Sequence, residues 1–231
     1  MIKNKNQTRP RKRELSLDKI AEAALHLLRD KGEDALTMRS VAEACGVTAM
    51  AIYHHVSDKE TLATIVIDRL FQQAAASPSS DSDWRSALTR LWIDIRQRLL
   101  DVPGAGTIFV RRAVIGPGTA RLSEEMFRLL SQGGIEGTAA AEAADAMTML
   151  CIGSIANELS RPPKIRERLV EQAPSEDLPH LMAHIEAYAV RDSEARYRVA
   201  LSWLIEGVAR GATPSRPIGG KRAATRRRRA N

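Results

Sequence analysis

The sequence predicts an all-α protein, and three observations support this. The chain of 231 residues is 44% hydrophobic but only 4% aromatic, and it is rich in alanine, which favours close-packed helices over sheets. Apolar residues recur at intervals of three and four along several segments. Runs that alternate apolar and polar residues between turn residues are missing. We expect a small N-terminal helical domain followed by a larger helical domain.

The first element expected after a basic arm of residues 1–15 is a helix over about residues 17–30. Ser16 is a suitable N-cap, and Lys31-Gly32 is a suitable stop. The apolar stripe of this helix consists of Ile20, Ala24, Leu27 and Leu28. This spacing predicts one buried face.

Three more helices are expected to complete a domain over residues 16–72. Thr37 caps a second helix that ends near Ala44, and a third helix runs from about Thr48 to His55. Ser57-Asp58-Lys59-Glu60 has the S-x-x-E form of a capping box, which predicts that a fourth helix begins there and continues through Phe71.

A run rich in serine and alanine, residues 74–83, predicts the boundary to a second domain over residues 84–211. Residues 160–175 are expected to form a loop, because they hold three prolines and many charges. The helices expected in this domain cover about 84–100, 107–114, 120–131, 138–159, 176–190 and 194–210.

The basic charge is concentrated at the two ends of the chain. The net charge is +7, but residues 1–13 hold six Lys/Arg and residues 214–231 hold seven, with no acidic residue in either segment. The remaining body carries 22 basic and 28 acidic residues. Basic arms of this kind indicate a nucleic-acid partner, although arms that serve only solubility have the same composition. Residues 212–231 are expected to be a disordered tail.

Several protein classes are disfavoured. Cys45 and Cys151 are far apart and fit neither a disulfide framework nor a zinc ribbon, so a reducing, cytoplasmic setting is expected. Stretches free of charge are too short to cross a membrane, and no apolar region follows the basic N-terminus as in a signal peptide. Nucleophile elbows, phosphate-binding glycine loops and paired catalytic carboxylates are not found, so we expect no enzymatic activity.

Only Cys45-Gly46-Val47 separates the second and third helices, which predicts a helix-turn-helix. Its buried residues would be Val41, Ala42, Val47, Ile52 and Val56. The opposite face of the third helix then presents short, mixed side chains that suit a major groove. A metal site at the adjacent histidines His54 and His55 is the less favoured alternative, because neighbouring residues on a helix point apart.

A longer stretch, LTMRSVAEACGVTAMAIYHHVSDKETLATIVIDRL, resembles the DNA-binding domain of the tetracycline-repressor (TetR) family. It fits the pattern L-T-x-R-x-[VL]-A-x-x-x-G-V-x-x-x-x-[IL]-Y-x-H-V-x-[ND]-K-x-x-L at almost every fixed position. The C-terminal half is similar, more loosely, to the subgroup that includes the tetracycline repressors themselves. The resemblance implies a homodimer with a helical domain for ligand binding and dimerisation.

The resemblance also implies which residues contact DNA. Arg39 would read a guanine edge, Lys59 would meet the DNA backbone, and His55 would approach a phosphate or the neighbouring helix. The full set implied is Arg39, Thr48, Ala49, Met50, Tyr53, His54, His55 and Lys59. From the residues alone, the less favoured alternatives are that Arg39 is a solvated surface residue and that Tyr53 belongs to the core, while packing in the core is as well supported for Met50 as DNA contact. Ala49 stands where the tetracycline repressors have a polar base reader.

A ligand cavity in the second domain is likewise implied. Its candidate residues are Trp92, Arg96, Phe109, Met126, Met147, Met149, Asn157 and His184, and the alternative is that they are ordinary core residues. The run RRAVIGPGT lacks the metal-coordinating histidine of the tetracycline binders. We therefore expect no tetracycline–magnesium complex, no other metal and no cofactor.

Residues 138–159 and 194–210 carry more apolar surface than one core stripe needs, which predicts a two-fold helix bundle between two copies. Burial within one subunit is the alternative. We expect a ligand-responsive homodimeric repressor that binds a near-palindromic operator in double-stranded DNA and is released by a small-molecule inducer. The competing hypothesis is a sequence-indifferent DNA-coating protein driven by the basic tails.

Overall fold

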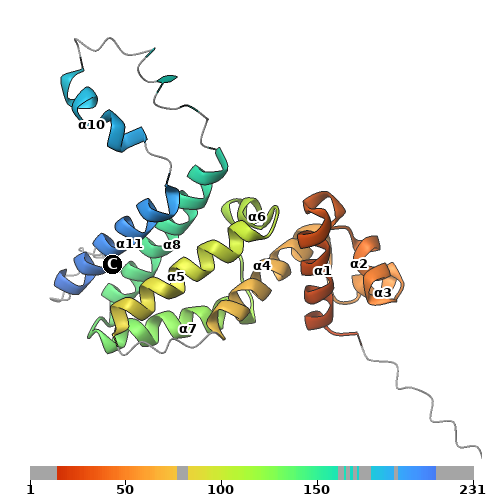
Figure 1. The fold of residues 1–231 in the computed structure, drawn as a ribbon. Helices are drawn as coiled ribbons and strands as arrows, with labels where there is room; N and C mark the ends of the chain where they lie inside the picture. The colour runs from red at the N-terminus through yellow and green to blue at the C-terminus, as the bar shows by residue number, and fades with distance from the viewer. Residues whose placement is uncertain are drawn as a thin grey trace, which may run out of the picture.

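A computed structural model describes residues 15–76, 83–160, 178–189 and 192–211, together with the isolated residues 164, 167–168 and 171. The described residues form helices and no strand, which confirms the all-α prediction. Figure 1 shows a small helical unit at one end of the molecule and a larger bundle at the other, with α4 between them. The expected loop over residues 160–175 lies outside the described residues, apart from Ser160 at the end of α8 and those isolated positions, and so do residues 1–14 and 212–231 of the basic tails.

The small unit begins with α1 (Leu17–Lys31), whose N-cap Ser16 accepts a hydrogen bond from the Lys19 amide as expected. A 3-10 turn, η1 (Glu33–Ala35), leads into α2 (Met38–Cys45), and α3 (Ala49–Tyr53) follows. Thr37 caps α2 and exchanges hydrogen bonds with Ser40 in a capping box. Helix α1 packs against both α2 and α4 and so connects these two helices.

The fourth helix, α4 (Lys59–Ala75), begins one residue later than the capping-box pattern predicts. Its N-cap is Asp58, whose carboxylate accepts from the Thr61 amide at 2.6 Å. Ser57 instead donates its hydroxyl to that carboxylate. A carboxylate is a stronger acceptor than a hydroxyl at a helix N-terminus, which explains the shift. Glu60, the expected return partner of the box, forms an ion pair with Arg112 in the second domain.

The larger bundle contains α5 (Trp84–Asp101), α6 (Ala105–Arg111), α7 (Pro117–Gln132), α8 (Gly137–Ser160), α10 (Pro179–Ala189) and α11 (Ser193–Gly211). The starts of α6, α7 and α10 differ from the expected residues 107, 120 and 176. Helix α6 begins early because Gly104 adopts a left-handed conformation (φ 81°) immediately before it. Helix α7 begins at Pro117, because proline suits the first position of a helix. Figure 1 shows α10 standing away from the rest of the bundle.

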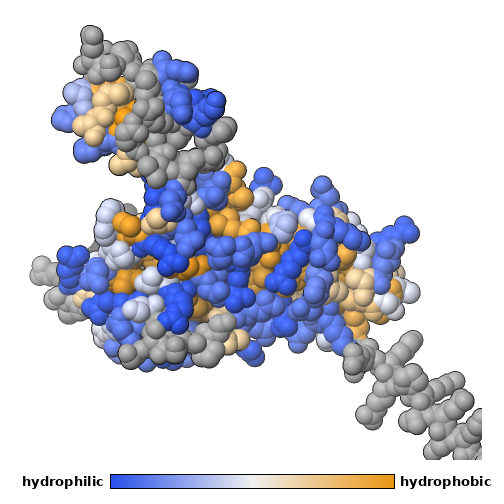
Figure 2. Space-filling view, in the orientation of Figure 1, coloured by the Kyte–Doolittle hydropathy of each residue, from blue (hydrophilic) through white to orange (hydrophobic). Residues whose placement is uncertain are grey.

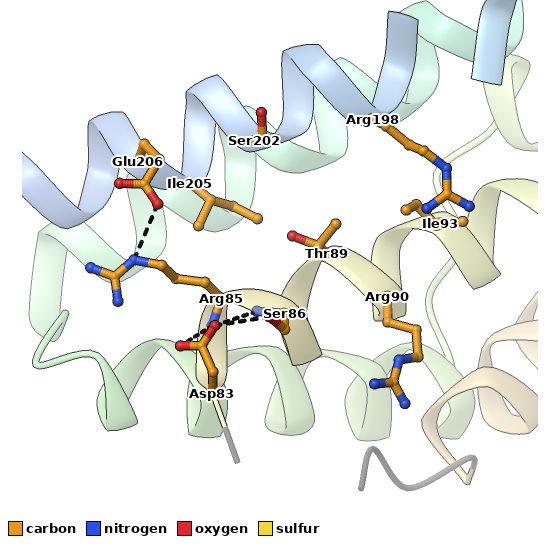
Figure 3. Close-up of a pocket in the computed structure, with 10 residues that line it drawn as sticks. All are labelled: Asp83, Arg85, Ser86, Thr89, Arg90, Ile93, Arg198, Ser202, Ile205 and Glu206. Carbon is orange, nitrogen blue, oxygen red and sulfur yellow. Dashed lines mark hydrogen bonds and ion pairs between the residues drawn. The ribbon is translucent and has the colours of Figure 1, made fainter. Parts of the chain in front are cut away.

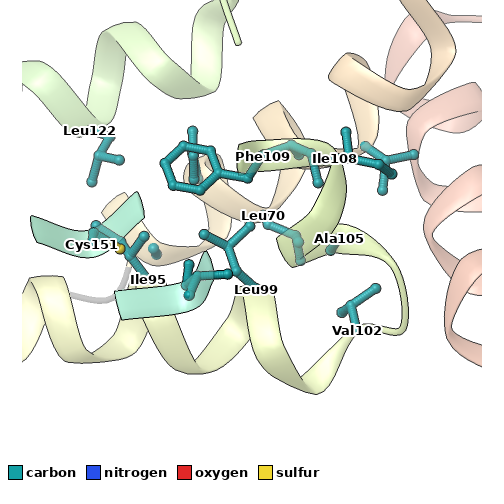
Figure 4. Close-up of a cluster of buried hydrophobic side chains, with 14 of the residues drawn as sticks. Leu70, Ile95, Leu99, Val102, Ala105, Ile108, Phe109, Leu122 and Cys151 are labelled. Carbon is teal, nitrogen blue, oxygen red and sulfur yellow. The ribbon is translucent and has the colours of Figure 1, made fainter. Parts of the chain in front are cut away.

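One hydrophobic core runs through both units, because α4 contributes to each. Its apolar side includes Leu62, Val66 and Leu70, all buried. Figure 4 shows Leu70 of α4 close to Leu99 of α5, with Phe109 of α6, Leu122 of α7 and Cys151 of α8 around them. The rings of Phe71 and Phe109 meet edge to face, with centroids 5.5 Å apart. Helix α4 is therefore the structural link between the two units.

Among the described helices, α8 alone has the length and hydropathy that would be sufficient to cross a membrane. It packs against α5, α6, α7 and α11. Met147, Cys151 and Ile155 on its inner side have no exposed surface. These contacts are those of a core helix in a bundle.

Cys151 makes a testable contribution to alkaline stability. Burial raises the pKa of its thiol from 9.0 to about 11, while contacts with Tyr197 and Arg96 lower it less. The unfolded thiol therefore ionises first as the pH rises, so this contribution is complete below pH ~9 and declines above it. Between pH 8 and pH 10 we expect the stability advantage of the wild type over Cys151→Ala to shrink by about 1 kcal/mol in urea unfolding. An advantage that is equal at both pH values would contradict this.

Candidate nucleic-acid interface and effector cavity

The turn between α2 and α3 depends on Gly46. This residue is left-handed (φ 66°, ψ 35°), and its amide donates to the carbonyls of Ala42 and Glu43. The Val47 amide also donates to the Ala42 carbonyl, at 3.0 Å. These bonds satisfy two carbonyls near the end of α2, and glycine adopts the left-handed angles they require without strain. The turn therefore fixes the angle at which α3 leaves α2.

Helix α3 is anchored through one side only. Ile52 and Val56 are buried against a core that includes Val41 and Ala42, as the sequence predicts, while Val47 is half-buried at its edge. Thr48 caps α3 by accepting from the Ala51 amide at 3.3 Å. The other side of the helix, with Met50 and Tyr53, is exposed.

The outward face of α3 holds most of the residues assigned to DNA. Met50 is 67% exposed and Tyr53 is 50% exposed, and His54 and His55 are exposed just beyond the helix. Ala49 differs, because it is half-buried and packs against the core. Figure 2 shows pale orange atoms at the end of the molecule where Figure 1 places α3, so this face is less hydrophilic than its surroundings. A mixed surface of this kind suits thymine methyl groups and base edges.

Two cations flank α3. The Arg39 side chain of α2 is almost fully exposed, and its Nε donates to Glu43 Oε1 at 3.2 Å. An exposed ion pair of this type is weak, so Arg39 can exchange Glu43 for a base or phosphate at little cost. Lys59 is exposed as the first residue of α4, where the helix dipole also attracts anions. Within the described residues, no group of three or more His, Cys, Asp or Glu side chains could hold a metal.

A cavity of about 340 Å³ lies in the second unit and includes three of the predicted ligand residues, Trp92, Phe109 and Met126. It opens between α4, α5, α6, α7 and α8. The other lining residues are Phe71, Ile95, Arg112, Ala113, Val114, Thr119, Leu122, Ser123, Thr148 and Ile152. The walls are thus mostly apolar, with hydroxyl groups and one guanidinium.

The remaining predicted ligand residues lie elsewhere. Met147 is fully buried in the core. Met149 and Asn157 line a separate open groove between α8 and α11, and His184 is exposed on α10. Helix α8 is apolar on several faces, so its sequence does not distinguish the side facing the cavity from the side facing outward.

Arg96 is buried and holds helices together instead of lining the cavity. Its Nε donates to Ser154 Oγ of α8, and its Nη2 donates to Ser193 Oγ at the start of α11, both at 2.8 Å. Glu158 lies 3.8 Å away, and the guanidinium sits over the ring of Tyr197. These contacts satisfy a buried charge and tie α5 to α8 and α11.

Arg112, just after α6, is a cavity residue that the sequence analysis missed. Its Nη1 lies 2.7 Å from Glu60 Oε2 at the start of α4. This contact lowers the pKa of Glu60 and raises the pKa of Arg112. The second Arg of the RRAVIGPGT run was the available signal, but nothing local connects it to Glu60, which is 52 positions earlier.

The start of α7 is also held against α4, by Asp68. The Asp68 carboxylate accepts from the amides of Gly118 (2.9 Å) and Thr119 (2.7 Å) and from the Thr119 hydroxyl (2.9 Å). It therefore caps the N-terminus of α7 from another helix. Gly116 and Gly118 both lie so close to Asp68 that a Cβ atom at either position would clash with it.

A second, wider groove lies between the first half of α5 and α11. Figure 3 shows that it is lined largely by polar and charged side chains, among them Asp83, Arg90 and Arg198. Arg85 of α5 and Glu206 of α11 form an ion pair across it at 3.4 Å. It contains none of the predicted ligand residues.

Two family models match the chain. The model for bacterial regulatory proteins of the tetR family matches residues 20–64, and the model for the tetracyclin repressor-like C-terminal domain matches residues 77–211. A tetracycline repressor protein of class A from Escherichia coli is 29% identical over 209 residues, covering 88% of this chain and 94% of the relative. An HTH-type transcriptional regulator of Saccharopolyspora erythraea is 30% identical over 144 residues, covering 62% of this chain and 61% of the relative.

Solved structures share the fold. Apo ActR from Streptomyces coelicolor has a TM-score of 0.75 at 24% identity, covering 86% of this chain and 96% of ActR. A possible TetR family transcriptional regulator from Streptomyces coelicolor A3(2) has a TM-score of 0.66 at 26% identity, covering 85% of this chain and 100% of that protein. The helix-turn-helix unit and the helical bundle each match their family model, so the chain belongs to the TetR family of bacterial transcriptional regulators.

Proposed function

We propose that this TetR-family protein is a ligand-responsive homodimeric repressor acting in the cytoplasm. The observation that carries the proposal is the exposed outer face of α3, with Met50, Tyr53 and His54 presented beside Arg39 and Lys59. Two such faces would enter successive major grooves, about 34–36 Å apart, on a near-palindromic operator in double-stranded DNA. The DNA contacts would be made by the residues assigned above. Ala49 is half-buried, so only the exposed part of its side chain could contact DNA.

Dimerisation is proposed through residues 138–159 and 194–210. Trp203 of α11 is 72% exposed, and Val199 of α11 and Met149 of α8 are exposed as well. No atom of the described residues lies within 4 Å of the Cβ position of Gly153 or Gly207, so a second helix could approach closely there. An exposed apolar surface with small residues is typical of a helix–helix interface.

The proposed inducer site is the cavity of about 340 Å³ around Trp92, Phe109 and Met126. ActR, which shares the fold, has been solved in complex with (S)-DNPA and with actinorhodin, which supports a ligand site in this fold. Because α4 contributes Phe71 to the cavity wall and directly follows the DNA-binding helices, we propose α4 as the route of transmission. A ligand shifts the equilibrium only by its difference in affinity for the two states, typically ~1–3 kcal/mol.

Deleting residues 1–13 and 214–231 separates this proposal from a sequence-indifferent DNA-coating protein. The removed segments carry 13 basic residues, so overall affinity should fall and depend less on salt. For a repressor, preference for one site should survive in a gel-shift assay with competitor DNA. Loss of both binding and preference would favour the coating protein.

A further inference from the structure

The chemistry of the cavity points to the class of its ligand. Arg112 is the only charged residue in the described lining, and no acidic side chain accompanies it there. The rest of the wall is apolar, apart from the hydroxyl-bearing residues Thr119, Ser123 and Thr148. A cavity with one cation in an apolar wall favours an organic ligand that carries an anionic group.

The indole of Trp92 adds a second requirement. Trp92 lines the cavity and is only 4% exposed. Its Nε1–H makes no hydrogen bond within the described residues. A buried donor without an acceptor is unfavourable, so a shift of the indole that brings this N–H to a ligand oxygen would be stabilising.

The partner of Arg112 links this chemistry to the DNA-binding unit. Glu60 is the second residue of α4 and follows α3 after a short connection. Its ion pair with Arg112 joins the start of α4 to the loop between α6 and α7. Arg112 thus contacts an acidic group on α4 and also lines the cavity, and an anion in the cavity that takes the Nη1 donor would break the contact with Glu60.

We propose that the effector is an organic acid with a largely apolar body, whose carboxylate or equivalent oxyanion displaces Glu60 as the partner of Arg112. This rests on the proposed function, because the cavity is the inducer site of that proposal. The Arg112–Glu60 pair marks the operator-binding state, and the acid selects the state in which Arg112 faces the cavity. By linkage, operator DNA weakens acid binding by the same factor by which the acid weakens operator binding.

The test compares one- to three-ring aromatic carboxylic acids with their primary amides, which have the same shape but no charge. Binding to the full chain is followed by calorimetry. At least one acid is expected to bind the wild type about tenfold or more tightly than its amide. Arg112→Gln should abolish that preference, and Arg112→Lys should retain part of it. Glu60→Gln should tighten acid binding, because the competing carboxylate is gone.

The matched control is Arg111→Gln, which removes an exposed neighbouring cation that does not line the cavity. This variant should keep the acid preference. Equal binding of acids and amides to the wild type would overturn the proposal, as would a preference that survives Arg112→Gln. Failure of every acid to bind at about 1 mM would also overturn it. A melting curve for each variant shows that it is folded.

Gel shifts on the same variants separate the ligand class from the proposed function. Acid-dependent release from operator DNA in the wild type, and its loss in Arg112→Gln, supports both. If the protein binds DNA specifically but no acid affects this binding, the repressor function is supported and the proposal of an organic-acid effector is overturned. If acid binding depends on Arg112 but the protein has no preferred DNA site, the ligand class is supported and the proposed regulatory role of the acid is overturned.

Discussion

Replacing Gly118 by alanine is expected to lower the free energy of unfolding by about 3 kcal/mol or more. A Cβ atom at this position would lie 1.9 Å from the backbone oxygen of Asp68. The clash is with the backbone of α4, so a change of side-chain rotamer cannot relieve it. Helix α7 would have to move away from α4, which would also break the hydrogen bonds from Gly118 and Thr119 to the Asp68 carboxylate.

Urea unfolding followed by circular dichroism measures this effect. Gly211→Ala is the matched control, because no atom of the described residues lies within 4 Å of its Cβ position, and it should change stability by less than about 0.5 kcal/mol. Asp68→Ala should be destabilising by about 1–3 kcal/mol through the lost cap alone. If Gly118→Ala were as stable as Gly211→Ala, the close contact between α4 and α7 would be wrong.

Replacing Tyr53 by alanine is expected to weaken specific DNA binding by about 1–3 kcal/mol per half-site, while non-specific binding changes little. Tyr53 is half exposed on the outer face of α3, so its ring is available to a base or sugar. The fold should be almost unaffected, because Ile52 and Val56 provide the buried anchors of this segment.

Tyr53→Phe is the control, since it keeps the ring and removes only the hydroxyl. Fluorescence anisotropy at fixed salt, with operator and scrambled duplexes, gives the ratio of specific to non-specific affinity for each variant. If Tyr53→Ala kept the wild-type ratio, the proposed contact between α3 and the bases would be wrong.

The helix-turn-helix could be predicted from the sequence because it depends on local signals. Ser16 and Thr37 cap their helices, Gly46 takes the left-handed turn, and Ile52 and Val56 are buried as their spacing indicates. Each of these interactions joins residues that are close together in the chain. Ala49 is the exception, because its partial burial depends on how α3 packs against the core.

The cavity could be predicted only in part, because its polar residues are defined by distant contacts. Trp92, Phe109 and Met126 could be predicted because they are large apolar residues of the second domain. Arg112 depends on Glu60, and the start of α7 depends on Asp68, and both partners are about fifty positions away on α4. Periodicity carries no information about such pairs. Met149 and Met147 on α8 show the same limit, since both suit an apolar wall but only Met147 faces inward.

Footprinting of the purified full-length protein on the DNA upstream of its own gene tests the central claim most directly. Two copies of α3, held by a dimer of the bundle, should protect an inverted repeat whose half-sites are about 10 bp apart from centre to centre, on one side of the duplex. Hydroxyl-radical cleavage resolves that pattern. Continuous protection without a preferred site, or a single protected half-site at every protein concentration, would contradict it.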